Sequence, residues 1–266
     1  MNQEQFIFKK SLGQNFLKNR ALVERIASCV PLTKNDLVIE VGPGLGIMSS
    51  LLCDIAGSVL AYEIDERLED PLLYLASKKG NLKVIFNDFL NCNVLEDIEN
   101  YEYDKLYFIS NLPYYITTPI ITKIIEDQVP VTAMVIMVQK EVGDRFVAQP
   151  GSKEYGSLTV FLNYYFDIKK QFLVKKTEFK PMPKVDSEVV LLKKKDNLLS
   201  VINFQHFQKL VKDSFQFKRK TIRNNLKNYD LTIVEKILLQ NKFSLMSRAE
   251  EIPVEVFVNI SNALQS

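Results

Sequence analysis

Five short apolar runs, separated by segments of helical periodicity, limit this chain to an α/β fold. The runs contain the β-branched and apolar side chains that are typical of buried strands, and they lie at residues 37–41, 59–64, 82–86, 106–109 and 133–138. Because strands that alternate with helices form parallel pairs, the pattern predicts a doubly wound, mostly parallel sheet. Helices are expected at residues 21–30 (with Asn19 as the cap), 47–55, 68–76, 119–126 and 142–146. Two late strands, expected to pair with each other, are predicted at residues 158–166 and 189–193.

The pattern changes after a polar, charged stretch at residues 193–197, which is a plausible domain boundary. Beyond it, helical periodicity alone is found, at residues 204–217, 221–226, 231–239 and 253–264. The sequence therefore predicts an α/β domain at residues 1–195, followed by a small all-helical domain at residues 196–266.

Composition excludes several classes of protein. Hydrophobic residues make up 47% of the 266 residues and charged residues 25%, as in folded soluble proteins. No apolar stretch approaches the length of a membrane span, and the first ten residues lack the apolar core of a secretory signal. The three cysteines form no CxxC pair, and His206 is the only histidine, so we expect reduced thiols in a cytoplasmic protein and no metal site.

The charge is distributed unevenly along the chain. Residues 171–266 contain 17 Lys and Arg against 10 Asp and Glu, which leaves 17 against 22 for residues 1–170. A basic C-terminal part indicates a polyanionic partner such as nucleic acid. The alternative is that these lysines only make a helical tail soluble.

A glycine-rich loop joins the first predicted strand to a helix. It carries Gly42, Gly44 and Gly46 in a GxGxG spacing, with Glu40 two residues before the first glycine. The dinucleotide fingerprint would need its third glycine at Ile47, and no GK[ST] phosphate loop follows. The loop resembles motif I of methyltransferases that use S-adenosyl-L-methionine, although a tight turn without a ligand would also need glycines.

Carboxylates end the next two strands. Glu63 can accept hydrogen bonds from both hydroxyls of a ribose, as in dinucleotide folds, and Asp88 can accept one from an adenine amino group. Solvated strand ends are the alternative for either residue alone. The ordered set on successive strands favours binding of the cofactor.

The tetrapeptide after the fourth strand suits methylation of an exocyclic amine. Such a nitrogen is a poor nucleophile, and Asn111 Oδ1 and the Leu112 carbonyl could accept its hydrogens and free the lone pair. Pro113 would shape the turn and Tyr114 would stack on the base, a contact worth about 1–3 kcal/mol. The tetrapeptide resembles motif IV of amino methyltransferases. A cytosine-C5 enzyme is not expected, because no cysteine follows a proline.

The whole set resembles the ribosomal RNA adenine N6-dimethyltransferase family, over residues 8–192 strongly and over the tail weakly. Two further segments match this family, one around Phe16 and one from Phe179 to Ser187. The resemblance implies a Rossmann-like methyltransferase domain with a small C-terminal helical domain, and a pocket for S-adenosyl-L-methionine. That pocket would be lined by Asn15, Leu17, Gly42, Gly44, Gly46, Glu63, Asp88 and Asn111.

The resemblance also implies a substrate. Phe179 would stack on the target adenine opposite Tyr114, and the targets would be two adjacent adenines in the 3′-terminal hairpin loop of small-subunit (16S) ribosomal RNA. Each adenine would receive two methyl groups, on a pre-30S particle, from a monomeric enzyme. The forms of the motifs favour this small-subunit branch. At residues 47–49 the chain departs from the Leu-Thr that is usual in the family, which we expect to affect helix packing.

Other functions remain open from the sequence. They are a large-subunit enzyme of the macrolide-resistance type, a DNA adenine methyltransferase, and a non-catalytic ribosome-assembly or transcription factor on the same fold. The last would need neither the acceptors nor the cofactor residues.

The tail contains a cluster of cations next to Phe215 and Phe217. We expect RNA phosphates to be bound by Lys218, Arg219, Lys220 and Arg223. The alternative is a solvated helix face with the phenylalanines in the core.

Overall fold

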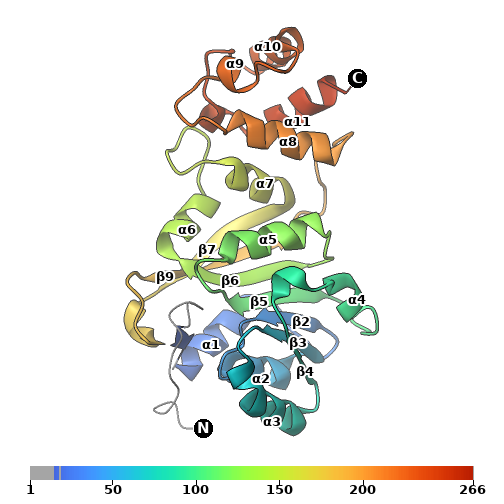
Figure 1. The fold of residues 1–266 in the computed structure, drawn as a ribbon, viewed down its shortest axis with the longest axis vertical. Coiled ribbons are helices and arrows are strands. Elements are labelled where there is room, and N and C mark those ends of the chain that lie inside the picture. Colours follow the sequence, from blue (N-terminus) through green and yellow to red (C-terminus); the bar gives the residue numbers. More distant parts are fainter. Residues whose placement is uncertain (1–14, 18, 266) are drawn as a thin grey trace. The chain divides into compact units, whose positions relative to one another are not determined.

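The computed structural model describes residues 15–17 and 19–265, and the chain divides into two units (Figure 1). Of the described residues, the first unit contains those up to Gly143 together with Lys169–Lys193. The second contains Asp144–Ile168 and the residues from Lys194 onward. Residues 144–168 thus belong to the second unit, which begins earlier in the chain than the expected boundary at residue 195. The first part of the stretch that resembles the family, residues 8–14, lies outside the described residues.

A seven-stranded sheet forms the centre of the first unit, with the strand order β4-β3-β2-β5-β6-β9-β7. Its strands from β4 to β6 pair in parallel, and β9 is antiparallel to β6. The predicted doubly wound, mostly parallel sheet is therefore confirmed. The strands are β2 (Leu37–Val41), β3 (Ser58–Glu63), β4 (Leu82–Phe86), β5 (Leu106–Asn111), β6 (Ala133–Gln139), β7 (Phe166–Val174) and β9 (Ser187–Lys194).

Alternate residues of these strands face two apolar layers. Val38 and Ile109 lie in one core cluster with side chains of α1 (Arg20–Ala27) and α2 (Ile47–Ile55). Residues one position along the strands face the opposite way, where the rings of Tyr62 and Phe108 contact Phe89. Apolar runs without polar alternation are expected for strands buried on both faces. The remaining helices of this part are α3 (Glu69–Lys79), α4 (Val94–Ile98), α5 (Thr117–Glu126) and α6 (Lys140–Phe146), and α6 continues into the second unit.

The chain reverses its direction of progress across the sheet between β2 and β5. It moves from β2 to β3 and β4 on one side, and returns to place β5 and β6 on the other. The carboxyl ends of β2 and β5 are thus neighbours, and Ser110 Oγ donates a hydrogen bond to the Val41 carbonyl. In doubly wound sheets this switch point is where a ligand binds.

A separate two-stranded sheet closes one side of this region. Its strands are β1 (Phe16–Leu17) and β8 (Phe179–Lys180), which pair antiparallel, with Leu17 opposite Phe179. Asn19 then begins α1, and its side chain accepts a hydrogen bond from the Leu22 amide at 3.4 Å. The expected cap is confirmed.

The second unit is helical apart from the start of β7 and the last residue of β9, and its helices pack around a common apolar core. Phe207, Val234 and Phe257 are fully buried in that core. The predicted C-terminal helices are confirmed, with shorter bounds for most. They are α8 (Phe204–Ser214), α9 (Ile222–Asn225), α10 (Leu231–Gln240) and α11 (Val254–Ala263).

One sequence prediction of secondary structure is wrong. Residues 158–166, expected as a strand, form helix α7 (Ser157–Tyr165), and β9 pairs with β6 and β7 instead. The segment is rich in aromatic and β-branched residues, and periodicity does not separate a short buried helix from a strand. Thr159 Oγ1 accepts the Gly156 amide and donates to the Arg145 carbonyl, which anchors the first turn of the helix.

Candidate active site

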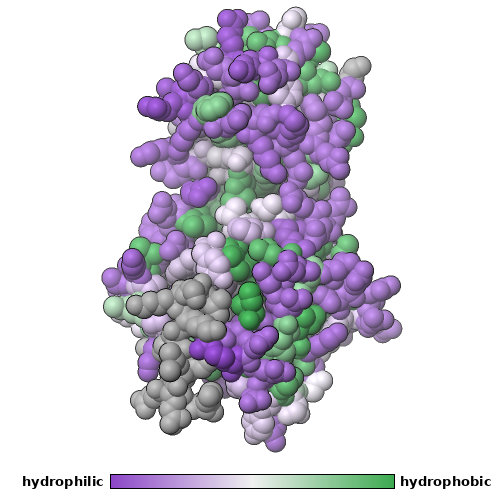
Figure 2. Space-filling view, in the orientation of Figure 1, coloured by the Kyte–Doolittle hydropathy of each residue, from purple (hydrophilic) through white to green (hydrophobic). Residues whose placement is uncertain are grey.

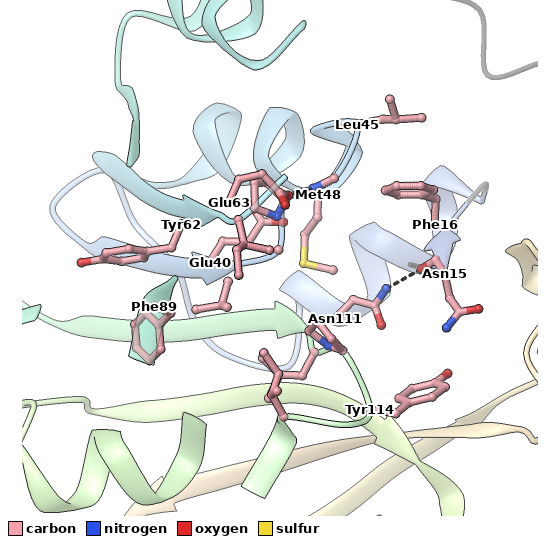
Figure 3. Close-up of a pocket in the computed structure, with 18 of the residues that line it drawn as sticks. Asn15, Phe16, Glu40, Leu45, Met48, Tyr62, Glu63, Phe89, Asn111 and Tyr114 are labelled. Carbon is pink, nitrogen blue, oxygen red and sulfur yellow. Dashed lines mark hydrogen bonds between the residues drawn. The ribbon is translucent and has the colours of Figure 1, made fainter. Parts of the chain in front are cut away.

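A cavity opens at the carboxyl ends of β2, β3, β4 and β5 (Figure 3). It encloses ≈ 980 Å³, counted with its opening to solvent. Its walls come from β1, the glycine-rich loop and the segments after β3, β4 and β5. The structure thus brings together motifs that are far apart in the sequence: Asn15, Leu17, Gly42, Gly44, Glu63, Asp88 and Asn111 all line this cavity.

The glycine-rich loop needs glycine for two different reasons. Gly42, Gly44 and Gly46 have φ of 73°, 59° and 76°, in the left-handed region that other residues adopt at a cost. A Cβ atom on Gly44 would also lie 2.6 Å from Cδ1 of Phe16, inside van der Waals contact. The half-buried ring of Phe16 therefore covers the loop directly, and leaves space only for bare backbone. Gly46 contributes the turn but does not line the cavity.

Glu63 is a buried carboxylate whose oxygens can each accept a further hydrogen bond. Its side chain is 5% exposed, Oε2 accepts the Gly44 amide at 3.1 Å, and Oε1 accepts the Asp65 amide at 2.9 Å. Burial raises the pKa of Glu63 above its usual range. Each carboxylate oxygen can accept two hydrogen bonds, so each retains a lone pair for one hydroxyl of a diol.

Asp88 lies two residues after the end of β4, half-buried in the cavity wall. Its Oδ1 accepts the Leu90 amide at 2.9 Å, which begins the 3-10 turn at Phe89–Asn91. This hydrogen bond fixes the carboxylate, and Oδ2 can accept from an amino group.

Glu40 is the third carboxylate in the cavity wall. It is 2% exposed, and Ser49 Oγ on α2 donates a hydrogen bond to its Oε2 at 2.6 Å. Burial raises the pKa of Glu40 to about 8, and the nearby Glu63 adds to this effect.

These groups fit S-adenosyl-L-methionine as a ligand. It presents a ribose diol, an adenine amino group and an amino-acid ammonium, and the cavity offers Glu63, Asp88 and Glu40 as acceptors beside a glycine loop that allows close approach. Among residues 15–17 and 19–265, no group of three or more His, Cys, Asp or Glu side chains could hold a metal ion.

The Asn111 side chain is held by the N-terminal segment. Its Nδ2 donates a hydrogen bond to the Asn15 carbonyl at 2.9 Å, drawn as the dashed line in Figure 3. This contact turns Oδ1 away from Asn15 and toward the side of Tyr114 (Figure 3). No described residue donates a hydrogen bond to Oδ1, so this oxygen is available as an acceptor. Leu112 and Pro113 also line the cavity, and the Leu112 side chain is 1% exposed.

Tyr114 lines the cavity with its hydroxyl anchored. The hydroxyl oxygen lies 2.6 Å from Ser187 Oγ, at the start of β9, and burial raises the pKa of Tyr114. A tyrosine ring held in this way is suited to stack on a base.

Two aromatic residues lie in places that the sequence analysis did not predict. Phe179 is 1% exposed and packs in the core with Leu17, and it does not line the cavity, so it presents no ring face to a base in this structure. Tyr115, which the sequence reasoning did not single out, lines the cavity and is 54% exposed. Its position directly after the tetrapeptide was the only signal.

The expected RNA-binding cations lie in the second unit. Lys218, Arg219, Lys220 and Arg223 are all exposed, and none forms a salt bridge with any described residue. Lys218 Nζ donates a hydrogen bond to the Lys153 carbonyl at 2.9 Å. The face of α8–α11 drawn in Figure 2 is mostly hydrophilic.

The two phenylalanines beside the cations have different environments. The Phe215 ring packs against Tyr155 and Phe257, as the core alternative predicts. Phe217, however, is 56% exposed beside the cations.

A family model and individual relatives both match this chain to ribosomal RNA methyltransferases. The sequence model of the family described as ribosomal RNA adenine dimethylase matches residues 5–266. Ribosomal RNA small subunit methyltransferase A of Bacillus cytotoxicus is 40% identical over 268 residues, which cover 97% of this chain and 92% of that protein. The protein of the same name from Bacillus cereus is 39% identical over 269 residues, with the same coverage.

Two solved structures resemble most of the chain. The 23S rRNA methyltransferase ErmE has a TM-score of 0.71 at 26% identity, and covers 95% of this chain and 100% of its own. A dimethyladenosine transferase from Plasmodium falciparum has a TM-score of 0.74 at 24% identity, and covers 92% of this chain and 95% of its own. The second likeness supports the fold alone.

Proposed function

The chain belongs to the ribosomal RNA adenine dimethylase family, and we propose that it dimethylates N6 of two adjacent adenosines in the 3′-terminal hairpin loop of 16S ribosomal RNA. It is an S-adenosyl-L-methionine-dependent methyltransferase with a Rossmann-like domain. The observation that carries the proposal is the Asn111 amide, fixed by Asn15 with its acceptor oxygen turned into the cavity.

The cavity would bind the methyl donor through three acceptors. Glu63 would accept both ribose hydroxyls, Asp88 the adenine amino group and Glu40 the ammonium, while Phe16 covers the glycine loop. When bound, S-adenosyl-L-methionine supplies an electrophilic methyl group. The role of the wall residues is to orient the donor, because a methyl transfer needs the nucleophile in line, and positioning of this kind lowers the barrier substantially.

Asn111 and Tyr114 would hold the target base. Asn111 Oδ1 and the Leu112 carbonyl would accept the two N6 hydrogens and make the nitrogen lone pair available. The Tyr114 ring, anchored by Ser187, would stack on the adenine. The proton can leave after transfer, so no general base is required. Loop adenines are suited to this site, because unpaired bases can be turned out of the stack.

The exposed cations of the second unit would contact RNA phosphates. The four side chains have no acidic partner among the described residues, which suits an exposed phosphate-binding surface. We further propose that the substrate is a pre-30S particle and that the enzyme acts as a monomer in the cytoplasm. In the part of the chain described here, no helix is both long and apolar enough to cross a bilayer.

A large-subunit substrate is the second candidate. It is favoured by the likeness to ErmE, which acts on 23S RNA by its name, whereas the 40% identity to small-subunit enzymes favours 16S RNA. Undermethylated small subunits and protein-free 23S RNA should therefore be offered in parallel, and the modified positions mapped by primer extension. Modification confined to 23S RNA would overturn the proposal.

Asn111→Ala tests the acceptor role within the same assay. Turnover should fall by roughly 10²–10³, the usual effect of removing one preorganised hydrogen-bonding group, while binding of S-adenosylhomocysteine should persist. Asn228→Ala, at an exposed position in the second unit, is the matched control. Full activity of Asn111→Ala would contradict the mechanism.

A further inference from the structure

Glu40 and Ser49 form a buried pair in the wall of the cavity. Glu40 is 2% exposed and Ser49 is fully buried, and the hydrogen bond between Ser49 Oγ and Glu40 Oε2 measures 2.6 Å. Glu40 ends in the cavity that Met48 and Glu63 also line (Figure 3). Through this pair, a buried side chain of helix α2 contacts a carboxylate that lines the cavity.

The carboxylate of this pair has no cationic partner. From residues 15–17 and 19–265, Ser49 alone donates a hydrogen bond to Glu40, and no Lys or Arg forms a salt bridge with it. Buried carboxylates are normally paired or protonated. Since Glu40 faces a cavity, a cationic group of the ligand can supply the missing charge.

We propose that Ser49 is a positioning residue that holds the Glu40 carboxylate toward the amino-acid part of the ligand, and that this contact makes ligand binding release a proton. The proposal rests on the proposed function, because it assumes that the cavity binds S-adenosyl-L-methionine and its product. It adds a role for Ser49 and a dependence on pH to that function.

The groups around Glu40 determine the sign of the effect. Ser49 and Cys53 face it from α2, Glu63 from β3, and Ser110 on β5 is engaged with the Val41 carbonyl. Burial and the negative charge of Glu63 raise the pKa of Glu40 to about 8, while the hydrogen bond from Ser49 acts in the opposite direction. No cation among these neighbours favours the ionised form.

The consequence for binding follows from this raised pKa. At pH 7 the empty site holds Glu40 mainly protonated, and an arriving ammonium favours the carboxylate, so a proton leaves. Affinity should increase by up to about tenfold per pH unit below the raised pKa, and level off above it until the ligand's own ammonium loses its proton. Without Ser49 the pKa of Glu40 would be higher still, and binding at pH 7 would be weaker.

The test compares two ligands by isothermal titration calorimetry in buffers of different ionisation enthalpy. S-adenosylhomocysteine carries the ammonium, whereas 5′-methylthioadenosine has the same adenine and ribose without the amino-acid part. Proton release near one at pH 7 is expected for the first ligand and clearly less for the second. Because both ligands contact Glu63 through ribose, the difference isolates the Glu40 end of the cavity.

Three variants complete the experiment. Ser49→Ala should weaken S-adenosylhomocysteine at pH 7 by about tenfold, one pKa unit, with less loss at pH 9 and unchanged binding of 5′-methylthioadenosine. Ser49→Thr keeps the hydroxyl and should have the wild-type affinity for S-adenosylhomocysteine at pH 7 and at pH 9. Glu40→Gln should abolish the difference in proton release, and serves as the readout if Ser49→Ala fails to fold.

Two results would overturn the inference. One is equal proton release with both ligands, and the other is a loss in Ser49→Ala that is the same for both ligands at every pH. A wild-type protein that binds neither ligand would instead remove the proposed function, and this inference with it.

Discussion

Replacing Gly44 by alanine should damage both the stability of the protein and its binding of S-adenosylhomocysteine, by two separable effects. The first is conformational, because Gly44 has a φ of 59°. The second is steric, because the new Cβ would lie 2.6 Å from Cδ1 of Phe16 and closer still to Cε1. The ring must therefore move away from the loop that it covers.

The two effects have comparable magnitudes. A left-handed backbone conformation costs an ordinary residue about 1–2 kcal/mol. The half-buried Phe16 ring packs with Leu68 and Leu72, and losing part of this packing should cost about 1.5–2 kcal/mol, roughly half the effect of removing a fully buried phenylalanine. Gly44→Ala should therefore destabilise the fold by about 3 kcal/mol, a large share of the stability of a typical domain.

Gly80 is the matched control. Its φ is 74°, close to that of Gly44, yet a Cβ atom there would meet nothing within 4 Å. Gly80→Ala should cost only the conformational part, about 1–2 kcal/mol, and leave ligand binding unchanged. Both variants can be measured by urea unfolding and by titration with S-adenosylhomocysteine, for which Gly44→Ala should lose at least about tenfold in affinity, or 1.4 kcal/mol.

A double variant isolates the steric effect. In Phe16→Ala the collision partner is absent, so adding Gly44→Ala should cost only as much as Gly80→Ala does, with a coupling of about 1.5 kcal/mol between the two sites. If Gly44→Ala were no more harmful than Gly80→Ala in either measurement, Phe16 would not cover the loop as described.

Two further predictions concern the ends of the binding surface. Glu63→Gln replaces one acceptor oxygen by an amide NH2 group that faces the Gly44 amide or a ribose hydroxyl. It should weaken the binding of S-adenosylhomocysteine by about 1.5–2 kcal/mol in a calorimetric titration. Glu66→Gln, at an exposed position, should leave the affinity unchanged, and equal affinities of the two variants would contradict the binding of the diol by Glu63. Arg219→Ala should lower the slope of RNA affinity against salt concentration by about one unit, whereas Lys236→Ala on α10 should not; identical slopes in filter-binding assays would mean that Arg219 does not contact phosphate.

Much of the fold could be predicted because its central strands are buried on both faces. Strands β2 and β4 have the predicted bounds. Strand β3 begins and ends one residue earlier than predicted, and β5 and β6 end two residues and one residue later. Glu63 and Asn111 are the last residues of β3 and β5, and Gly42 and Asp88 come within two residues after β2 and β4. The parallel arrangement alone therefore brings these residues to one edge of the sheet.

The features of the fold and of the site that the sequence did not predict depend on contacts between distant parts of the chain. Helix α7 has the composition of a strand and is helical in the packed second unit, where Val160 and Leu162 are buried. Phe179 belongs to a matching motif, yet its pairing with Leu17 directs it into the core. The bond between Asn15 and Asn111 and the pair of Ser49 with Glu40 are also tertiary, and no local pattern indicates them.

The pairing of β1 with β8 has a consequence for how the protein is made. Phe16 and Leu17 leave the ribosome early, but the partners that hold them, Lys180 and Phe179, are translated only after most of the sheet. Contacts that close so long a stretch of chain form late, because the entropy of closure must be overcome first. A growing chain can thus assemble β2 to β6 while the glycine loop still lacks its cover. Competence to bind the methyl donor should therefore arise only after β8 has emerged and holds Phe16 and Leu17 in place.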